Sequence, residues 1–446
     1  MKASIESEKW FKQILEQDTQ FGDNTPDWLM EYRNQAKQLA HDSFDRGLLP
    51  KRKQEAWRYT SLSKLQENSF YLNFDASESE KDLRLKNEWL GGFDSYRAVF
   101  VEGRFSSQLS ELDGLPSDCY VGSLAQAMTK YSELISKWVG QSNANQSSIF
   151  SQLNNAMLKD GLFVYLPKGK QLKRPIEVIY LSGGEEKLLL SQPHNLIMIE
   201  NAAQATLTER FISLNTLVHF NNYVTEVFLA PQAILNHVQV QQQNFQSYYL
   251  NHVGLALESE SDYCGTFLAL GGAMARTELS VDFKQAGAKC SLNGLYTISE
   301  EQVIDFHLDI RHGVPGCESE THFKGVVLAK GRAVFDGSIV IEKDAQKSQA
   351  HLSNKNLLLT RKAEVDSKPQ LEIYADDVKC SHGTTIGQLE EEQVFYLCSR
   401  GLSEHNARKL LAMGFAKDSL NQIKITELSH TLETLIEGVL ETGVKQ

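Results

Sequence analysis

A cysteine and a histidine two residues apart are the strongest candidates for chemistry in this sequence of 446 residues. Cys380 and His382 lie in the stretch Asp-Asp-Val-Lys-Cys-Ser-His-Gly, residues 376–383. Alternate side chains of an extended segment point to the same side. Because thiolate and imidazole both bind transition metals, one metal centre could use the pair. The simpler interpretation is a buried thiol beside a surface imidazole, since C-x-H is a weak motif.

The pair is too small to hold a metal alone. No second cysteine or histidine lies within four residues of Cys380 and His382, so a local tetrahedral zinc site is not expected. An iron-sulfur centre normally takes four protein ligands, mostly thiolates. The remaining ligands would have to come from another chain or from distant residues.

The other cysteines give a weaker signal. The six cysteines include no C-x-x-C pair, so we expect reduced thiols and neither a zinc knuckle nor a disulfide framework. Cys264, Cys290 and Cys317 follow one another at nearly even intervals, which are comparable to one coil of a β-helix. Stacked above one another, they could carry sulfur or metal. Cysteine is also a common small core residue, and we favour that interpretation.

Grouped carboxylates offer an enzymatic alternative. Asp305, Asp309, Asp376 and Asp377 could act as acid and base on a sugar polymer if they lay on an exposed β-surface. A solvated strand face explains them more simply, and polysaccharide-acting enzymes are usually exported, whereas this N-terminus lacks an export signal. The sequence contains neither a G-x-x-x-x-G-K-[ST] phosphate loop nor a G-x-S-x-G elbow. We therefore expect a protein that is not an enzyme.

Composition narrows the partners and the compartment. With 57 acidic against 45 basic residues, the formal charge is -12, which provides no broad positive field for nucleic acid or anionic lipid. No run of about 18 apolar residues occurs, so no membrane span is expected. We expect a folded cytoplasmic protein.

Four regions follow one another along the chain. Residues 1–60 have helical periodicity and predict an N-terminal helical lobe, and residues 61–160 are a mixed α/β region leading into the core. Residues 161–385 contain more than a dozen short β-branched and aromatic runs punctuated by Gly, Asn or Pro. A propeller would show a repeat every ~40 to 45 residues, and none is found, while a sandwich is favoured only by general frequency. The pattern favours a β-helix, followed by a helical domain over residues 386–446.

The last region predicts three helices. The first ends at Arg400 and Gly401, and Ser403 can cap a second helix that ends at Gly414. The third is expected over about residues 420–439. Its apolar face is broad for three helices to bury, so we expect part of it to await a partner.

Several short motifs resemble one protein family. They are Glu-Ala-Trp-Arg-Tyr-Thr (55–60), Asn-Leu-Leu-Leu (356–359), Pro-Gln-Leu-Glu-Ile (369–373), Asp-Asp-Val-Lys-Cys-Ser-His-Gly-Thr-Thr (376–385), Gly-Gln-Leu (387–389), Phe-Tyr-Leu (395–397) and Arg-Gly (400–401). Their density makes a chance match implausible. The chain resembles the SufB/SufD family of the SUF iron-sulfur cluster assembly machinery, and its SufD branch more than its SufB branch.

The resemblance implies a right-handed parallel β-helix flanked by N-terminal and C-terminal helical domains. It implies a non-catalytic scaffold subunit that pairs with SufB and binds the SufC ATPase through the C-terminal domain, so that ATP acts only through SufC. Phe395, Tyr396, Arg400 and Gly401 are the expected SufC-binding residues. The sequence leaves open a homodimer of the isolated chain.

The resemblance also assigns a role to the candidate ligand pair. Cys380 and His382 match the family's cysteine and histidine at the SufB interface, where the histidine is implicated in nascent cluster assembly or iron entry. A transient iron-sulfur cluster or iron would then be shared with SufB, which would supply the missing ligands.

Overall fold

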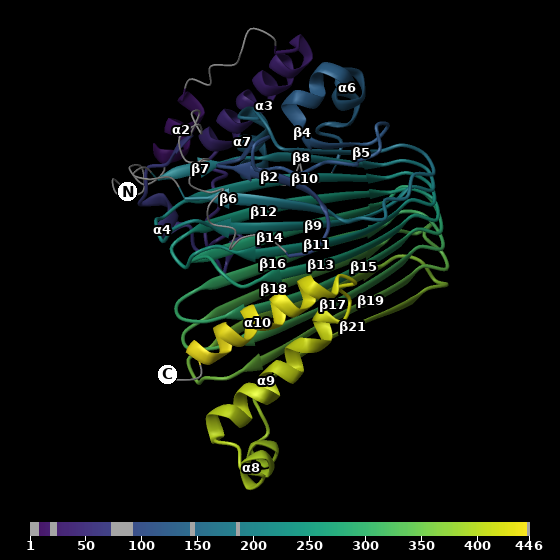
Figure 1. Ribbon diagram of the computed structural model, residues 1–446. Coiled ribbons are helices and arrows are strands. Elements are labelled where there is room, and N and C mark those ends of the chain that lie inside the picture. Colours follow the sequence, from purple (N-terminus) through teal and green to yellow (C-terminus); the bar gives the residue numbers. More distant parts are fainter. Residues whose placement is uncertain (1–8, 18–24, 73–91, 143–147, 184–187, 444–446) are drawn as a thin grey trace.

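Short strands wind into a parallel β-solenoid that forms the centre of the molecule (Figure 1). This computed structural model describes residues 9–17, 25–72, 92–142, 148–183 and 188–443. The predicted β-helix with helical regions at both ends is confirmed. The solenoid has two sheets, called sheet A and sheet B below, and each coil contributes one strand to each sheet.

From β8 onward the strands of each sheet stack in chain order, and every second strand of the sequence joins the same sheet. Sheet A contains β4 (Tyr120–Ser123), β5 (Leu162–Leu166), β8 (His194–Ile199), β10 (Phe220–Leu229), β12 (Tyr248–Leu257), β14 (Met274–Phe283), β16 (Val303–His312), β18 (Arg332–Ile341) and β20 (Glu364–Ile373), with β7 (Leu189–Ser191) joining β10 to β1 (Tyr71–Leu72). Sheet B contains β3 (Arg104–Phe105), β2 (Tyr96–Val101), β6 (Ile176–Ser182), β9 (Gln204–Ser213), β11 (Ile234–Gln242), β13 (Asp262–Ala269), β15 (Lys289–Ile298), β17 (Glu318–Val327), β19 (Gln349–Leu358) and β21 (Lys379–Gly387).

The coil length varies along the solenoid. Register partners at the starts of successive strands of sheet B are residues 204, 234, 262, 289, 318, 349 and 379. The intervals between these positions are unequal, so neighbouring coils differ in length. A sequence separation close to one coil length does not by itself place two side chains in one column.

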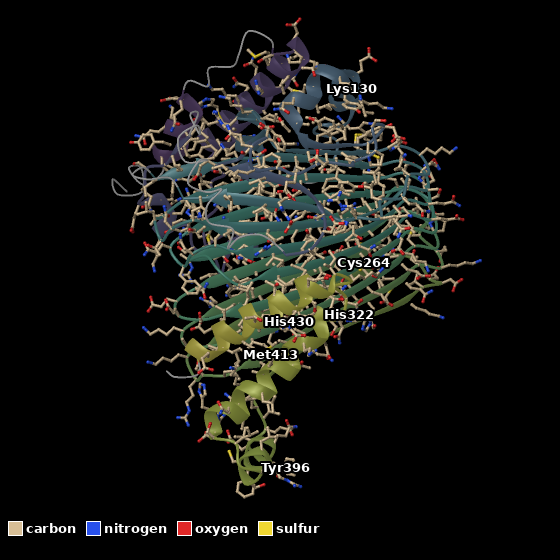
Figure 2. All side chains as sticks on the ribbon, in the orientation of Figure 1. Lys130, Cys264, His322, Tyr396, Met413 and His430 are labelled. Atoms are coloured by element: carbon tan, nitrogen blue, oxygen red, sulfur yellow. The ribbon has the colours of Figure 1, made fainter. Side chains whose placement is uncertain are left out.

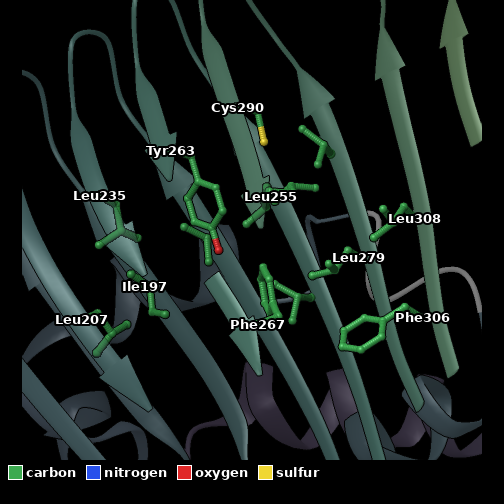
Figure 3. Packing of buried hydrophobic residues seen from close by; sticks show 14 of the residues in the cluster. Ile197, Leu207, Leu235, Leu255, Tyr263, Phe267, Leu279, Cys290, Phe306 and Leu308 are labelled. Carbon is green, nitrogen blue, oxygen red and sulfur yellow. The ribbon is translucent and has the colours of Figure 1, made fainter. Parts of the chain in front are cut away.

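The solenoid interior is filled by alternate residues of both sheets, most of them apolar (Figure 3), with a buried polar cluster of Glu209, His237 and Gln239 in the middle coils. Rings from neighbouring coils stack, as Tyr180 and Phe211 do with their centroids 4.9 Å apart. Phe323 of sheet B likewise contacts Phe306 and Phe335 of sheet A, at 5.1 and 5.3 Å. Each fully buried side chain of this size contributes about 1.5–3 kcal/mol, so the column supplies the main stabilisation of the solenoid.

The N-terminal helices cover the outer face of sheet A near the start of the solenoid (Figure 1). These are α2 (Lys9–Glu16), α3 (Asp27–Asp45), η1 (Glu55–Trp57), α4 (Ser63–Gln66), α6 (Leu124–Trp138) and α7 (Ile149–Ala156). Residues 1–60, whose periodicity predicts helices, contain α2, α3 and η1, and residues 18–24 lie outside the described residues. Trp10 of α2 stacks on Phe150 of α7 at 6.4 Å, above Phe220 of β10.

The C-terminal region folds into α8 (Glu391–Ser399), α9 (Glu404–Leu420) and α10 (Thr426–Gly443). Gly401 has a φ of +96°, as its predicted place after the first helix requires, and the Ser403 hydroxyl accepts a hydrogen bond from the backbone N–H of Asn406. The predicted end of the second helix at Gly414 is wrong. An interior glycine costs a helix only about 1 kcal/mol, and burial of Ala416 and other residues beyond it outweighs that cost.

The apolar face of α10 packs on the solenoid, and our prediction that part of it awaits a partner is wrong. Leu428, Leu432, Ile436 and Leu440 are fully buried. They share a cluster with outward-facing residues of sheet B, which are Val238, Val240, Leu268, Leu295 and Val326. This outer face of the sheet is itself apolar, so the helix lies on it along the strands (Figure 1).

Candidate functional site

The solenoid ends in a coil without a cover. β20 and β21 are the last strands of their sheets, and each has a strand neighbour on one side only within the described ranges. Their residues are half-buried to exposed, in contrast to the buried strands before them. Ile373 is 43% exposed and Ile386 48% exposed. Open strand edges carry unpaired N–H and C=O groups, and with exposed apolar side chains they form a surface suited to pairing with another strand.

Cys380 and His382 lie together on this open coil. In the register of β21 with β19, Cys380 pairs with Ala350 and His382 pairs with Leu352, and both partners are buried inside the solenoid. The two side chains therefore share the inner face of β21, the face that the period of two predicts. Cys380 is half-buried against the core, and His382 is exposed because no coil follows.

Cys380 and His382 could bind a metal only if another chain supplied further ligands. Burial raises the pKa of the Cys380 thiol, so the sulfur is protonated near neutral pH and a metal must displace that proton. Across the part of the chain that the structure describes, no group of three or more His, Cys, Asp or Glu side chains is arranged to hold a metal ion. The inner face of β21 can offer at most an incomplete ligand set.

The three cysteines do not form the stack that their spacing allowed. Cys264 pairs with Ser291, one position after Cys290, and Cys290 pairs with Ser319, two positions after Cys317. A shift of one position moves a side chain to the other face of a strand. Cys264 accordingly lies on the outer face of sheet B, where α9 and α10 pack (Figure 2), and Cys290 lies inside.

The four carboxylates of the enzymatic alternative are not brought together. Asp305 is buried on the outer face of β16, with Oδ2 2.6 Å from Nη1 of Arg276 and 2.5 Å from Oγ1 of Thr60. Asp309 is exposed four residues along the same strand. The remaining pair, at 376 and 377, is exposed between β20 and β21. The most enclosed of the four carboxylates thus belongs to an ion pair that attaches the N-terminal region to the sheet.

The residues expected to bind SufC cluster on and just after α8. Figure 2 shows Tyr396 at the tip of the C-terminal region, away from the sheets. Phe395 is 75% exposed and Tyr396 57% exposed, with the guanidinium carbon of Arg400 5.3 Å from the Tyr396 ring centroid. Gly401 ends the helix. Val394, next to Phe395 on the same helix, is buried.

Two hydroxyl groups at the open end were missed from the sequence. Thr384 follows His382 on the inner face of β21, and its Oγ1 lies 2.9 Å from Oγ of Ser367 in β20. The signal was present, because the same period of two that joins Cys380 to His382 also includes residue 384. Ser367 could not be found this way, since it approaches from the other sheet.

These features define a class: a helix-flanked parallel β-solenoid whose final coil is open and carries a thiol and an imidazole. The sequence profile of the "SUF system FeS cluster assembly, SufBD core domain" matches residues 180–415, and that of the "SufBD protein N-terminal region" matches residues 6–178. The chain belongs to the SufBD family of the SUF iron-sulfur cluster assembly system.

Relatives in three organisms are similar over most of their length. The chain is 32% identical over 401 residues to the iron-sulfur cluster assembly protein SufD of Escherichia coli, covering 89% of this chain and 90% of that protein. It is 32% identical to the iron-sulfur cluster assembly SufBD family protein slr0076 of Synechocystis, covering 87% of each chain. It is 28% identical to the chloroplastic protein ABCI7 of Arabidopsis thaliana, covering 88% of this chain and 82% of that protein.

The helices give no sign of a membrane segment. Within the described residues, none of them is both long enough and apolar enough to cross a bilayer.

Proposed function

We propose that this chain is the SufD-type, non-catalytic scaffold subunit of a SUF assembly complex, with separate surfaces for SufB and for the SufC ATPase. The open last coil is the observation that carries the proposal. It combines free strand edges, exposed apolar residues and a partial ligand set at one place. An edge of this kind is stabilised when a second solenoid pairs with it.

The SufB surface is formed by β20 and β21. Pairing with a second chain would cover Ile373 and Ile386 and enclose Cys380 and His382 between the two solenoids. His382 would contribute an imidazole ligand, since a neutral imidazole binds iron near pH 7, and Cys380 would contribute a thiolate once metal displaces its proton. SufB would complete the set, and iron or a nascent cluster is cargo that passes through this shared site. Without SufB, the same surface would pair two copies of this chain.

The SufC surface is formed by α8, through Phe395, Tyr396 and Arg400 and the turn at Gly401. The aromatic side chains are exposed on a helix whose Val394 side is anchored. ATP binds only to SufC in this proposal. The chain's working compartment is the cytoplasm, as the sequence predicts.

A force applied to α8 can reach the open end through α9. Lys324 of β17 donates to the Phe415 carbonyl at 3.0 Å and lies 2.8 Å from Oδ2 of Asp418, so α9 is fixed to the outer face of sheet B. β17 is two strands away from β21 in that sheet. In this proposal, ATP-driven dimerisation of SufC pulls on α8, biases a two-state movement of the last coils and exposes the shared site.

Replacing the imidazole tests the metal role. His382→Ala in the complex reconstituted with SufB and SufC should lower cluster yield without dissociating the complex, because the side chain is exposed and packs little. His430→Ala is the matched control, because His430 is an exposed histidine of α10, the helix that packs on the outer face of sheet B (Figure 2). Unchanged yield for His382→Ala would remove the imidazole from the mechanism.

A second candidate is a bare scaffold in which Cys380 and His382 only shape the interface. The raised pKa of the Cys380 thiol favours it, because a protonated sulfur is a poor ligand. Normal cluster output from a Cys380→Ser, His382→Asn variant that still captures SufB would support the bare scaffold. Lost output with intact capture would support the shared site.

A further inference from the structure

A closed ring of hydrogen bonds is buried inside the last complete coils. The Tyr296 hydroxyl donates to Oδ1 of Asn356 at 2.6 Å, and Nδ2 of Asn356 donates to Oδ1 of Asn354 at 2.7 Å. Nδ2 of Asn354 donates back to the Tyr296 hydroxyl at 2.9 Å. All three residues are at most 3% exposed. Burial raises the pKa of Tyr296, so the phenol keeps the proton that the ring uses.

A glycine makes this ring possible. Gly325 of β17 pairs with Tyr296 on one side and with Asn356 on the other, so it lies between them in the inner column. A Cβ atom there would lie 2.0 Å from Cε2 of Tyr296 and 2.4 Å from Oδ1 of Asn356. Only a residue without a side chain lets the hydroxyl pass across β17 to the amide.

The ring continues to the open end. The Ser367 hydroxyl of β20 donates to Oδ1 of Asn354 at 2.8 Å, and the Thr384 hydroxyl of β21 donates to Oγ of Ser367 at 2.9 Å. The last bond crosses the solenoid interior, because β20 belongs to sheet A and β21 to sheet B. A continuous chain of hydrogen bonds therefore runs from the buried ring to the exposed strand that carries His382.

The two inner columns that reach the open end pass from aromatic rings to polar side chains over the last two coils. The column that ends at Ser367 contains Phe306 and Phe335 in the preceding strands of sheet A. The column that ends at Thr384 contains Phe323 and then Asn354 in sheet B. These rings are local, because Thr277 precedes Phe306 and Gly294 precedes Phe323, but continuing the rings to the end would have extended the apolar core. Fully satisfied buried networks define one arrangement where apolar contacts would tolerate several.

We propose that Asn354, Ser367 and Thr384 are positioning residues that fix β21 across the interior to β20 and so set the direction of the His382 imidazole. Thr384 and His382 occupy consecutive inner positions of one strand, and β21 has backbone bonds to β19 alone among the strands that the structure describes. The hydrogen bond from Thr384 to Ser367 adds a second attachment, which joins β21 to β20 across the interior. The role of this direction in metal capture rests on the function proposed above.

Removing one hydroxyl from the open end tests the positioning. Thr384→Val deletes the donor to Ser367 and keeps the branched shape, while the buried ring remains intact. Thr385→Val is the matched control, because Thr385 is the same residue type on the next position of the strand, is exposed, and pairs with Lys355 on the outer face. Thr384→Ser keeps the donor and should restore the wild-type behaviour. Equal urea midpoints would show that all variants fold.

Two readouts separate positioning from function. The first is the ring resonance of His382 in the histidine-labelled full chain, assigned with His382→Ala. The second is cluster yield in the complex with SufB and SufC. We expect Thr384→Val to shift and broaden the His382 resonance and to lower cluster yield by up to about tenfold. Loss of a direct hydrogen-bond partner of a metal ligand costs at least that much, and Thr384 acts on His382 only through the strand. Thr385→Val should change neither.

The outcomes distinguish the two proposals. An unmoved His382 resonance in Thr384→Val, or an equal shift in Thr385→Val, overturns the positioning role. A shifted resonance with unchanged cluster yield supports positioning but overturns the metal role of His382. A shifted resonance with reduced yield that Thr384→Ser restores supports both.

Discussion

Removing the buried carboxylate of Asp305 should loosen the N-terminal region from the solenoid. Its Oδ2 lies 2.6 Å from Nη1 of Arg276. The same oxygen accepts a hydrogen bond from the hydroxyl of Thr60, which lies far earlier in the chain. Arg276 is 2% exposed and also packs its guanidinium 4.0 Å from the Trp57 ring centroid. Asp305→Ala therefore leaves a buried cation with one carboxylate fewer, and breaking such a pair costs roughly 3–5 kcal/mol.

The lower end of that range applies here. Arg276 keeps Glu278, whose Oε1 lies 2.7 Å from its Nε. A loss of about 3 kcal/mol multiplies the equilibrium constant for local opening by about a hundredfold. Hydrogen exchange of the peptide that contains residues 55–60 should accelerate by that factor, and the urea midpoint should fall. Asp309→Ala is the control, because this exposed carboxylate of the same strand should change exchange little.

The pH dependence of the effect has a defined sign. Burial opposes ionisation of Asp305, but Arg276 and His307 together with the Thr60 hydroxyl outweigh burial and lower its pKa. The carboxylate therefore stabilises the fold above its unfolded pKa of about 3.9, and the contribution is lost as pH falls through the lower folded value. The difference between wild type and Asp305→Ala should be full at pH 7 and shrink below about pH 4. Equal exchange rates in wild type, Asp305→Ala and Asp309→Ala at pH 7 would show that Asp305 does not hold the N-terminal region on the solenoid.

Three further outcomes follow from burial. Leu432→Ala should destabilise the C-terminal helices by about 2–5 kcal/mol in urea unfolding, whereas Leu410→Ala, at a side chain 54% exposed, should cost far less; equal effects would contradict the packing of α10 on sheet B. Gly325→Ala should cost about 1–3 kcal/mol by overpacking the inner column, while Gly383→Ala, where a Cβ meets nothing within 4 Å, should be nearly neutral. Burial lowers the pKa of His312 to about 4, so the fold should lose ~3 kcal/mol as pH falls from about 6.5 to 4, and His312→Gln should flatten that slope; an unchanged slope would exclude this histidine as its source.

Features that depend on one strand could be predicted from the sequence. Strand runs bounded by Gly, Asn and Pro indicated the solenoid, and the period of two placed Cys380 and His382 on one face of β21. Gly401 and Ser403 marked a helix end and a helix start through local backbone chemistry. Each of these inferences uses contacts between residues a few positions apart.

Features that depend on pairing between coils could not be predicted. The register of β13 with β15 places Cys264 opposite Ser291, so Cys264 and Cys290 lie on opposite faces of sheet B, although their spacing suggested one column. The cover for α10 is an outward apolar face assembled from several strands, and no single strand reveals it. The sequence suggested a solvated or reactive carboxylate at Asp305, because its hydrogen-bond partner Thr60 lies in another region of the sequence.

Point variants of the full chain can show whether two separate surfaces bind the two partners. Deleting the C-terminal helices would uncover the apolar face of sheet B, so point variants are preferable. Phe395→Asp with Tyr396→Asp changes the exposed face of α8, and Ile386→Asp changes the open coil.

Each variant would be co-expressed with SufB and SufC and captured through a tag on this chain. We expect the α8 variant to lose SufC and keep SufB, and Ile386→Asp to lose SufB and keep the direct contact with SufC. Capture of both partners by both variants, or loss of both partners by either correctly folded variant, would contradict the proposal of two separate surfaces.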